Sequence, residues 1–143
     1  MAKLFRHFCC AALLLAALCS CTQPQPPATP EAEEETLART EFTTRIENFF
    51  EYVPLKANKP SVFRIHLTDL ADGTPVAMGQ VTLTARLAGS TQAAAETAAK
   101  VGKVTGIYVA ELSVPQPGTY DIEFHIRNAN LDERLPLSGF KVE

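Results

Sequence analysis

The chain contains no tryptophan, and its four cysteines all lie within the first 21 of its 143 residues. A domain built from the remaining residues can hold no internal disulfide, no thiolate-bound metal and no cysteine nucleophile. Acidic residues outnumber basic ones by 16 to 13, and the formal net charge of −3 argues against a nucleic-acid-binding protein. The sequence also lacks a Gly-x-Ser-x-Gly elbow, a phosphate-binding glycine loop and a His-Glu-x-x-His motif. We therefore expect no enzyme, no catalytic residue and no cofactor.

Apolar residues are concentrated at the N-terminus, where 16 of the first 20 residues belong to the apolar class. Lys3 and Arg6 flank the start of an apolar run over residues 8–19, which at 12 residues is shorter than a bilayer-spanning helix of roughly 20 residues. The run ends in Leu-Cys-Ser-Cys at residues 18–21, which resembles a bacterial lipobox. We predict a lipoprotein signal peptide over residues 1–20 and acylation of Cys21; a secretory peptide cut elsewhere is the alternative.

The predicted processing places the mature protein in the cell envelope as a periplasmic lipoprotein. Two or more acyl chains on Cys21 hold a protein stably on a membrane. Thr22 follows this cysteine, and it is not the aspartate that retains lipoproteins at the inner membrane in some bacteria. We therefore expect the outer membrane rather than the inner one.

Residues 21–40 are predicted to form a tether. They contain four prolines and four glutamates and almost no large apolar side chain, a composition that cannot bury enough surface to fold. At about 3 Å per residue such a segment can hold a domain some tens of Å from a membrane. The folded domain is then predicted to span residues 41–143.

From residue 41 onward, β-branched and aromatic residues alternate with polar ones between turn signals. Gly139 predicts a bulge in a last strand over residues 134–142, and Tyr120 stands where a tyrosine corner is expected. Six to eight short strands without intervening helices predict an all-β, immunoglobulin-like antiparallel β-sandwich. The clearest alternating rows are Phe63–Ile65–Leu67, Val81–Leu83–Ala85–Leu87, Tyr108–Ala110–Leu112–Val114 and Tyr120–Ile122–Phe124–Ile126.

Two segments are ambiguous. Residues 42–53 fit a single long strand, kinked near Asn48, that places Phe42, Ile46, Phe50 and Tyr52 on one face; they also fit a helix. Residues 92–100 are rich in alanine and have helical propensity, but their shortness and position between strands favour an irregular edge segment.

The candidate metal ligands after residue 21 are His66, His125 and Met78. Both histidines lie on the outward register of their strands, so they could meet only if those strands were neighbours in one sheet. A solvated histidine is the more common outcome, and we assign no metal site. Phe49 also falls on the outward register, as a candidate contact residue. Asp69 and Asp72 flank a turn, where aspartate commonly bonds the backbone.

Several landmarks together resemble the N-terminal β-domain of periplasmic adaptor (membrane fusion) subunits of heavy-metal efflux pumps of the resistance–nodulation–division class. Phe63 to Leu70, Phe-Arg-Ile-His-Leu-Thr-Asp-Leu, is the most specific of them, and the resemblance covers about residues 41–143. The other landmarks are the run Glu47–Leu55, Thr74-Pro75-Val76, Gly79, Gly106-Ile107-Tyr108 and Pro117-Gly118-Thr119-Tyr120.

The resemblance implies an exported domain that acts with a system expelling metal ions or other solutes. Full adaptors also carry barrel, lipoyl-like and coiled-coil parts, so we expect this stand-alone lipoprotein to be accessory to efflux pump components. The family's methionine ligands have no clear counterparts, because Met78 is the only methionine after processing. Two alternatives remain: a small copper or zinc carrier using the two histidines and Met78, and an envelope adhesion or assembly domain unrelated to transport. A β-sandwich fold does not choose among them.

Overall fold

The computed structural model describes residues 35–143, so the predicted signal peptide, Cys21 and most of the predicted tether lie outside the described residues. Ten strands and no helix occur in the described part. The strands are β1 (Leu37–Phe42), β2 (Ile46–Tyr52), β3 (Pro60–Asp69), β4 (Thr74–Pro75), β5 (Gln80–Leu87), β6 (Ala93–Ala98), β7 (Lys100–Val101), β8 (Ile107–Ser113), β9 (Gly118–Arg127) and β10 (Asp132–Val142). Within these residues no helix is long and apolar enough to cross a membrane.

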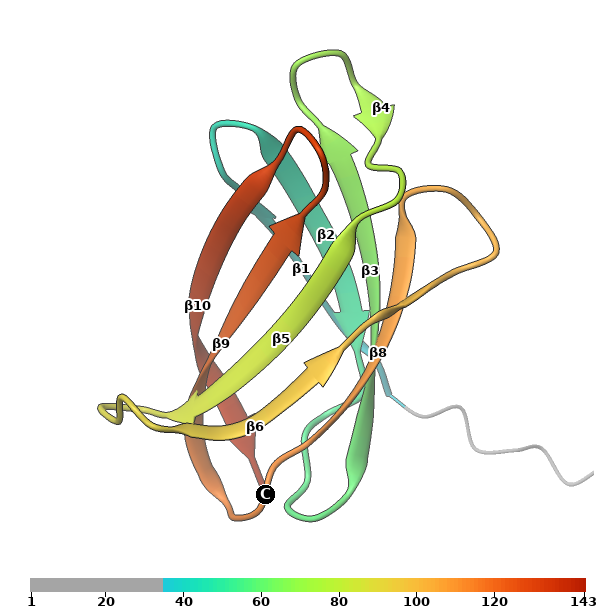
Figure 1. Cartoon of the computed structure of the whole chain (residues 1–143). Coiled ribbons are helices and arrows are strands. Elements are labelled where there is room, and N and C mark those ends of the chain that lie inside the picture. The colour runs from blue at the N-terminus through green and yellow to red at the C-terminus, as the bar shows by residue number, and fades with distance from the viewer. Residues whose placement is uncertain (1–34) are drawn as a thin grey trace, which may run out of the picture. The chain divides into compact units, whose positions relative to one another are not determined.

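The strands form two sheets that pack face to face (Figure 1). The six-stranded sheet has the order β1-β2-β3-β8-β7, with β4 paired to β3, and the four-stranded sheet has the order β10-β9-β5-β6. Neighbouring strands in both sheets are antiparallel. The predicted all-β antiparallel sandwich is confirmed. The count exceeds the predicted six to eight strands because β4 and β7 are two-residue strands that no sequence period can reveal.

The core lies between the sheets and is built from alternate residues of each long strand, as the period-two pattern predicts. At its centre, the Phe50 ring lies 4.8 Å from that of Phe124 across the two sheets, and the Tyr52 ring stacks on Phe63 at 5.1 Å. Each such side chain contributes about 1.5–3 kcal/mol by leaving water. A core of this size stabilises residues 35–143 without any disulfide.

The N-terminal boundary of the domain differs from the prediction. β1 begins at Leu37, so residues 37–40 of the predicted tether are the first strand, paired in register with β2. Leu37 and Phe42 at its two ends are exposed, and its inner face carries Arg39 and Glu41. Because this strand lacks an apolar row, its sequence reads as a continuation of the tether.

The prediction of one long strand over residues 42–53 is also wrong. β1 ends at Phe42, and the chain reverses through residues 43–45 before β2 begins. The Thr43 hydroxyl accepts hydrogen bonds from the amides of Arg45 and Ile46, at 3.1 and 3.0 Å, and so closes this turn. The buried face of β2 is Ile46, Asn48, Phe50 and Tyr52, whereas Phe42 is 60% exposed.

Three other features of the chain were predicted from the sequence. Residues 93–98 form β6, a strand at the edge of the four-stranded sheet, so the expected edge position is confirmed. Its pairing with β5 shifts register between Ala85 and Arg86, so the segment is a strand with one irregularity, at Ala94. The register of β10 shifts between Leu137 and Phe140, and Gly139 has a φ of 87°, which confirms the predicted bulge. The Tyr120 hydroxyl donates to the Gln116 carbonyl at 3.0 Å and forms the predicted tyrosine corner.

Arg39 closes the side of the sandwich where β1 and β10 are the outermost strands. Its guanidinium lies 4.9 Å from the centre of the Phe140 ring and donates to the Ser138 carbonyl at 3.1 Å. The same guanidinium holds the Glu41 carboxylate through two nitrogens, at 2.6 and 3.1 Å. A long side chain with its charge neutralised thus covers the core edge between two strands that are not paired.

Candidate functional site

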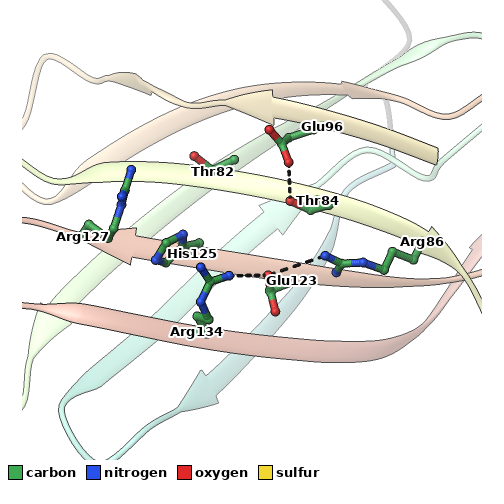
Figure 2. Close-up of a pocket in the computed structure, with 8 residues that line it drawn as sticks. All are labelled: Thr82, Thr84, Arg86, Glu96, Glu123, His125, Arg127 and Arg134. Atoms are coloured by element: carbon green, nitrogen blue, oxygen red, sulfur yellow. Dashed lines mark hydrogen bonds and ion pairs between the residues drawn. The ribbon is translucent and has the colours of Figure 1, made fainter. Parts of the chain in front are cut away.

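The candidate site is a polar groove on the outer face of the four-stranded sheet (Figure 2). It has a volume of about 340 Å³. Strand pairing places its side chains in rows: Thr82 lies opposite His125, which lies opposite Arg134, and Thr84 lies between Glu96 and Glu123. The lining residues are Thr82, Thr84, Arg86, Glu96, Glu123, His125, Arg127 and Arg134.

Glu123 is the centre of the charge network in the groove. Its carboxylate accepts a hydrogen bond from Arg134 at 2.9 Å and lies 3.9 Å from a guanidinium nitrogen of Arg86. The three residues come from β9, β10 and β5, so the network links three neighbouring strands. The Glu123 side chain is only 18% exposed, and its two partners hold it in one orientation.

Glu96 forms the other acidic wall of the groove. Its carboxylate accepts a hydrogen bond from the hydroxyl of Thr84, which is buried, at 3.0 Å. No basic side chain in residues 35–143 forms an ion pair with Glu96. This carboxylate therefore keeps the capacity to pair with a cation from outside the domain.

His125 and Arg127 line the groove where β9 approaches its end. The His125 Nε2 lies 2.7 Å from a carboxylate oxygen of Asp132, and Arg127 donates to the Gln80 side chain at 3.3 Å. The hydrogen bond with His125 is the main reason why the pKa of Asp132 is lowered, and Arg127 and Arg134 add to this effect. The groove thus presents fixed cationic and anionic groups, which suit a polar partner surface carrying charges of both signs.

The structure does not bring the candidate metal ligands together. His66 is on β3 and His125 on β9, in different sheets, and both side chains are on outward registers, so the core lies between them. Met78 lies in the loop before β5 and is 87% exposed. Residues 35–143 contain no cluster of three or more His, Cys, Asp or Glu side chains able to hold a metal ion. The condition on which a shared histidine site depended is not met.

Phe49 lies on the outer face of the six-stranded sheet, as its register predicts. Its ring packs edge-on against the His66 imidazole, with centroids 5.3 Å apart. Both side chains are partly exposed. This pair covers the middle of the sheet and explains an aromatic residue on a mainly polar face.

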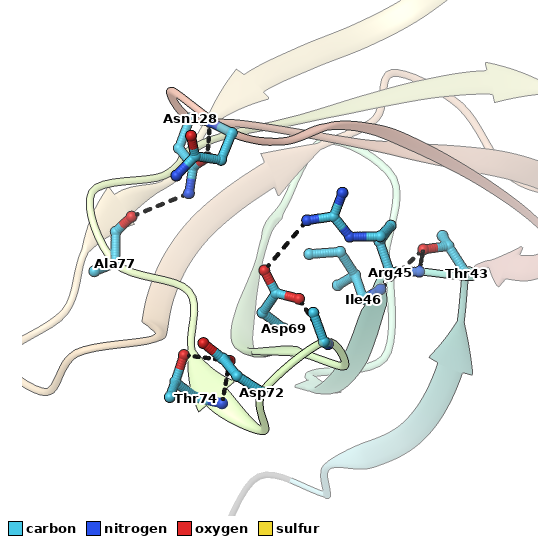
Figure 3. A network of polar contacts seen from close by, with 10 residues as sticks. Thr43, Arg45, Ile46, Asp69, Asp72, Thr74, Ala77 and Asn128 are labelled. Carbon is cyan, nitrogen blue, oxygen red and sulfur yellow. Dashed lines mark hydrogen bonds and ion pairs between the residues drawn. The ribbon is translucent and has the colours of Figure 1, made fainter.

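The aspartates near residue 70 organise one loop end of the sandwich (Figure 3). Asp69 accepts a hydrogen bond from the Ala71 amide at 2.9 Å and lies 3.6 Å from Arg45. Asp72 accepts bonds from the Thr74 hydroxyl and amide, which lower the pKa of its carboxyl. The predicted turn role of both aspartates is confirmed.

Sequence reasoning missed three residues with defined roles in this framework. Glu96 was hidden in an alanine-rich stretch whose strand character was not recognised. Tyr108 was assigned to the core by its register, but the sequence gives no sign that its hydroxyl bonds the backbone of another loop. Arg39 lay in the predicted tether, where a lone arginine carries no structural signal.

No protein-family model matches the chain, and no curated protein matches its sequence. Among solved structures, the chain is similar to the ZirS C-terminal domain, with a TM-score of 0.42 and 15% sequence identity. The superposition covers 97% of this chain and 94% of that one. A similarity at this level supports no statement about function, so the proposals below depend on the residues of the chain itself.

Proposed function

We propose that the chain is a lipid-anchored, non-enzymatic binding module of the cell envelope that serves an efflux system through protein contacts. The observation that carries the binding role is the groove on the four-stranded sheet. Three strands hold Arg86, Glu123 and Arg134 in one network, and Glu96 stands beside it without a basic partner. Binding a partner here would cost little conformational entropy in the groove, because its charged side chains are already held in place.

The envelope location rests on the N-terminal pattern. An apolar run of 12 residues and the lipobox-like residues 18–21 support export and acylation at Cys21. The efflux assignment rests on the adaptor-like landmarks, of which Phe63–Leu70 is the most specific. In the structure this stretch is most of β3, the strand between β2 and β8, so it contributes to the framework rather than to the groove.

Anchoring is tested by palmitate labelling of cells that express the full chain or its Cys21→Ala variant. We expect label and membrane fractionation for the natural chain and neither for the variant. Cys19→Ala is the matched control and should keep both, because Cys19 precedes the predicted cleavage site. Equal labelling of all three chains would contradict the assignment of Cys21.

The partner is tested by chemical crosslinking in cells, detergent extraction and pull-down, with and without added copper or zinc. We expect capture of an inner-membrane pump subunit or of its outer-membrane channel. A pull-down that contains envelope adhesion or assembly proteins and lacks transport components would contradict the efflux role and favour the alternative.

A further inference from the structure

β1 contributes no side chain to the hydrophobic core. Among the described strands longer than two residues, it alone has no residue in the core or packed against it. Its inner face carries Arg39 and Glu41, and the apolar residues at its two ends, Leu37 and Phe42, are exposed. β10, at an edge of the other sheet, instead buries Leu135, Leu137, Phe140 and Val142. β1 therefore gains little stability from burial of its own side chains.

Backbone pairing and one arginine hold β1 in place. The strand pairs with β2 in register along its whole length. Of its side chains only Arg39 is hydrogen-bonded to the other sheet, at the Ser138 carbonyl, and the same guanidinium lies over the Phe140 ring. The side chains of Arg39 and its partner Glu41 are 29% and 31% exposed, so water competes for their ion pair. Most of the bonds that hold β1 are thus ones that water can replace.

A polar side chain is enclosed where β1 covers β2. Asn48 lies opposite Glu41 and is fully buried, and neither its amide nitrogen nor its oxygen has a hydrogen-bond partner. The Glu41 carboxylate bonds Arg39 instead. β1 is the only strand between β2 and that edge of the sheet, so its release opens a path for water to the Asn48 amide. Because buried polar atoms without partners raise the free energy of the closed state, their hydration offsets part of the cost of uncovering the core edge.

β1 is also the strand through which the chain from Cys21 enters the domain, at Leu37. A load on the tether is applied at this end of the strand, where Leu37 and Tyr52 form the first pair of the ladder with β2. The ladder continues to the turn at residues 43–45, after which β2 begins. Release of β1 and this turn frees residues 37–45, which correspond to about 30 Å of extended chain.

We propose that β1 is a releasable strand, which separates from β2 while the rest of the sandwich stays folded, and that its release lengthens the connection between the membrane and the binding groove. Local opening of this kind is expected of an element with few buried apolar contacts and with hydrogen bonds near water. The anchored protein then has two distances over which its groove can reach a partner. The lengthening rests on the proposed membrane anchor, whereas the release itself does not.

Backbone amide exchange of the full chain in detergent micelles, followed residue by residue by NMR, tests the release. The Val53 amide donates to the Val62 carbonyl of β3. Because hydrogen bonding alternates along an antiparallel strand, the Phe49 and Glu51 amides also face β3, whereas the Phe50 amide faces β1. We expect exchange at Phe50 to be at least a hundredfold faster than at Phe49 and Glu51, and to be unchanged by low concentrations of urea. Equal rates at the three amides would overturn the proposal.

Three single variants test the contacts that control release. Arg39→Ala removes the bond to Ser138 and should speed exchange at Phe50 at least tenfold. Asn48→Leu removes the unpaired polar atoms and should slow it at least tenfold. Arg64→Ala, on the outer face of β3, is the control for loss of an exposed arginine and should leave the rate unchanged. Faster exchange in Asn48→Leu, or equal effects of the two arginine variants, would contradict the proposal.

A disulfide that locks β1 to β2 tests the added length. Ala38 and Glu51 lie opposite each other on the outer face, so the double variant Ala38→Cys, Glu51→Cys can form it. Single chains are pulled between residues 21 and 143. We expect a first, reversible step on the order of 30 Å before the sandwich unfolds, and no such step in the locked chain. One all-or-none unfolding event in both chains would overturn the proposal. Failure of palmitate labelling would defeat the membrane anchor and leave the exchange and pulling results unchanged.

Discussion

At the scale of single residues, Tyr108 shows how one buried hydroxyl can organise a loop. Its hydroxyl donates to the Val76 carbonyl at 2.7 Å and accepts from the Gly79 amide at 2.9 Å. The chain between β4 and β5 is thereby held against β8. Tyr120 makes a single bond of the same kind, to Gln116. The two tyrosines therefore differ in how many backbone groups lose a partner when the hydroxyl is removed.

We predict that Tyr108→Phe lowers the free energy of unfolding by about 2–3 kcal/mol, since it leaves two buried backbone groups unpaired. Tyr120→Phe should cost about 1 kcal/mol, the ordinary net value of one hydrogen bond. Urea unfolding of the two variants measures the difference. A larger loss for Tyr120→Phe would contradict the roles assigned to the two hydroxyls.

Asn48 is a polar residue in an apolar position. It is fully buried on the inner face of β2, and neither its amide nitrogen nor its oxygen has a hydrogen-bond partner in the structure. We predict that Asn48→Leu raises the free energy of unfolding by about 1–3 kcal/mol, because it removes two unsatisfied polar atoms. Asn48→Val gives the same test with a smaller side chain. Ser61→Ala is the control with the opposite expected sign. The buried Ser61 hydroxyl donates to the Val53 carbonyl, so its removal should lower the free energy of unfolding. Lower stability of both Asn48 variants would contradict this account.

The hydrogen bond between Asp132 and the groove residue His125 depends on pH. The pKa of the Asp132 carboxyl is lowered mainly by the hydrogen bond with His125, so the interaction stabilises the fold above the ordinary aspartate pKa of about 3.9 and is lost as the pH falls through the lowered value. Carbon-detected NMR titration should show this pKa rising toward its ordinary value in His125→Ala. The lowered pKa of Asp72 depends on Thr74 and should not change in that variant. An unmoved Asp132 pKa would show that His125 is not its main partner.

At the scale of strands and turns, the sequence predicted best where one face is continuously apolar. The rows in β3, β5, β8 and β9 are buried as expected, except for the partly exposed Leu87 at the end of β5, because burial of one face fixes the period and the register. The segments that were misjudged have no such row. β1 presents Arg39 and Glu41 inward, and β6 is mostly alanine, so their strand structure comes from pairing with β2 and β5 rather than from local preference.

Two glycines with positive φ, Gly106 in a turn and Gly139 in the bulge of β10, give a prediction at this scale. Gly106 and Gly139 both have φ above 80°, but a Cβ at Gly106 would lie 2.6 Å from the Cβ of Pro75, whereas none of the surrounding atoms would lie within 4 Å of one at Gly139. Gly139→Ala should therefore lower the free energy of unfolding only by the backbone strain, about 1–2 kcal/mol. Gly106→Ala should lower the free energy of unfolding by the same strain and by about 1–3 kcal/mol more, because of the steric overlap with Pro75. Thermal unfolding of both variants compares them, and equal losses would refute the crowding at Gly106.

At the scale of the whole molecule, the sandwich determines which side chains can act together. The sequence correctly placed His66 and His125 on outward registers, yet it could not say that β3 and β9 belong to different sheets. Strand order depends on contacts between segments distant in the sequence, and periodicity carries no information about them. For the same reason the groove, which gathers side chains from β5, β6, β9 and β10, was not predictable although each strand except β6 was.

The two outer faces also give the most direct test of the central claim, that the four-stranded sheet carries the binding surface. A photoreactive phenylalanine analogue is placed in living cells at Arg127, which lines the groove, or at Arg64, on the outer face of the six-stranded sheet. Both positions are exposed arginines on long strands, so the two variants are matched. We predict that illumination links position 127 to an envelope transport subunit and leaves position 64 without that adduct. Equal adducts at both positions, or an adduct at position 64 alone, would contradict the assignment of the binding surface to the four-stranded sheet.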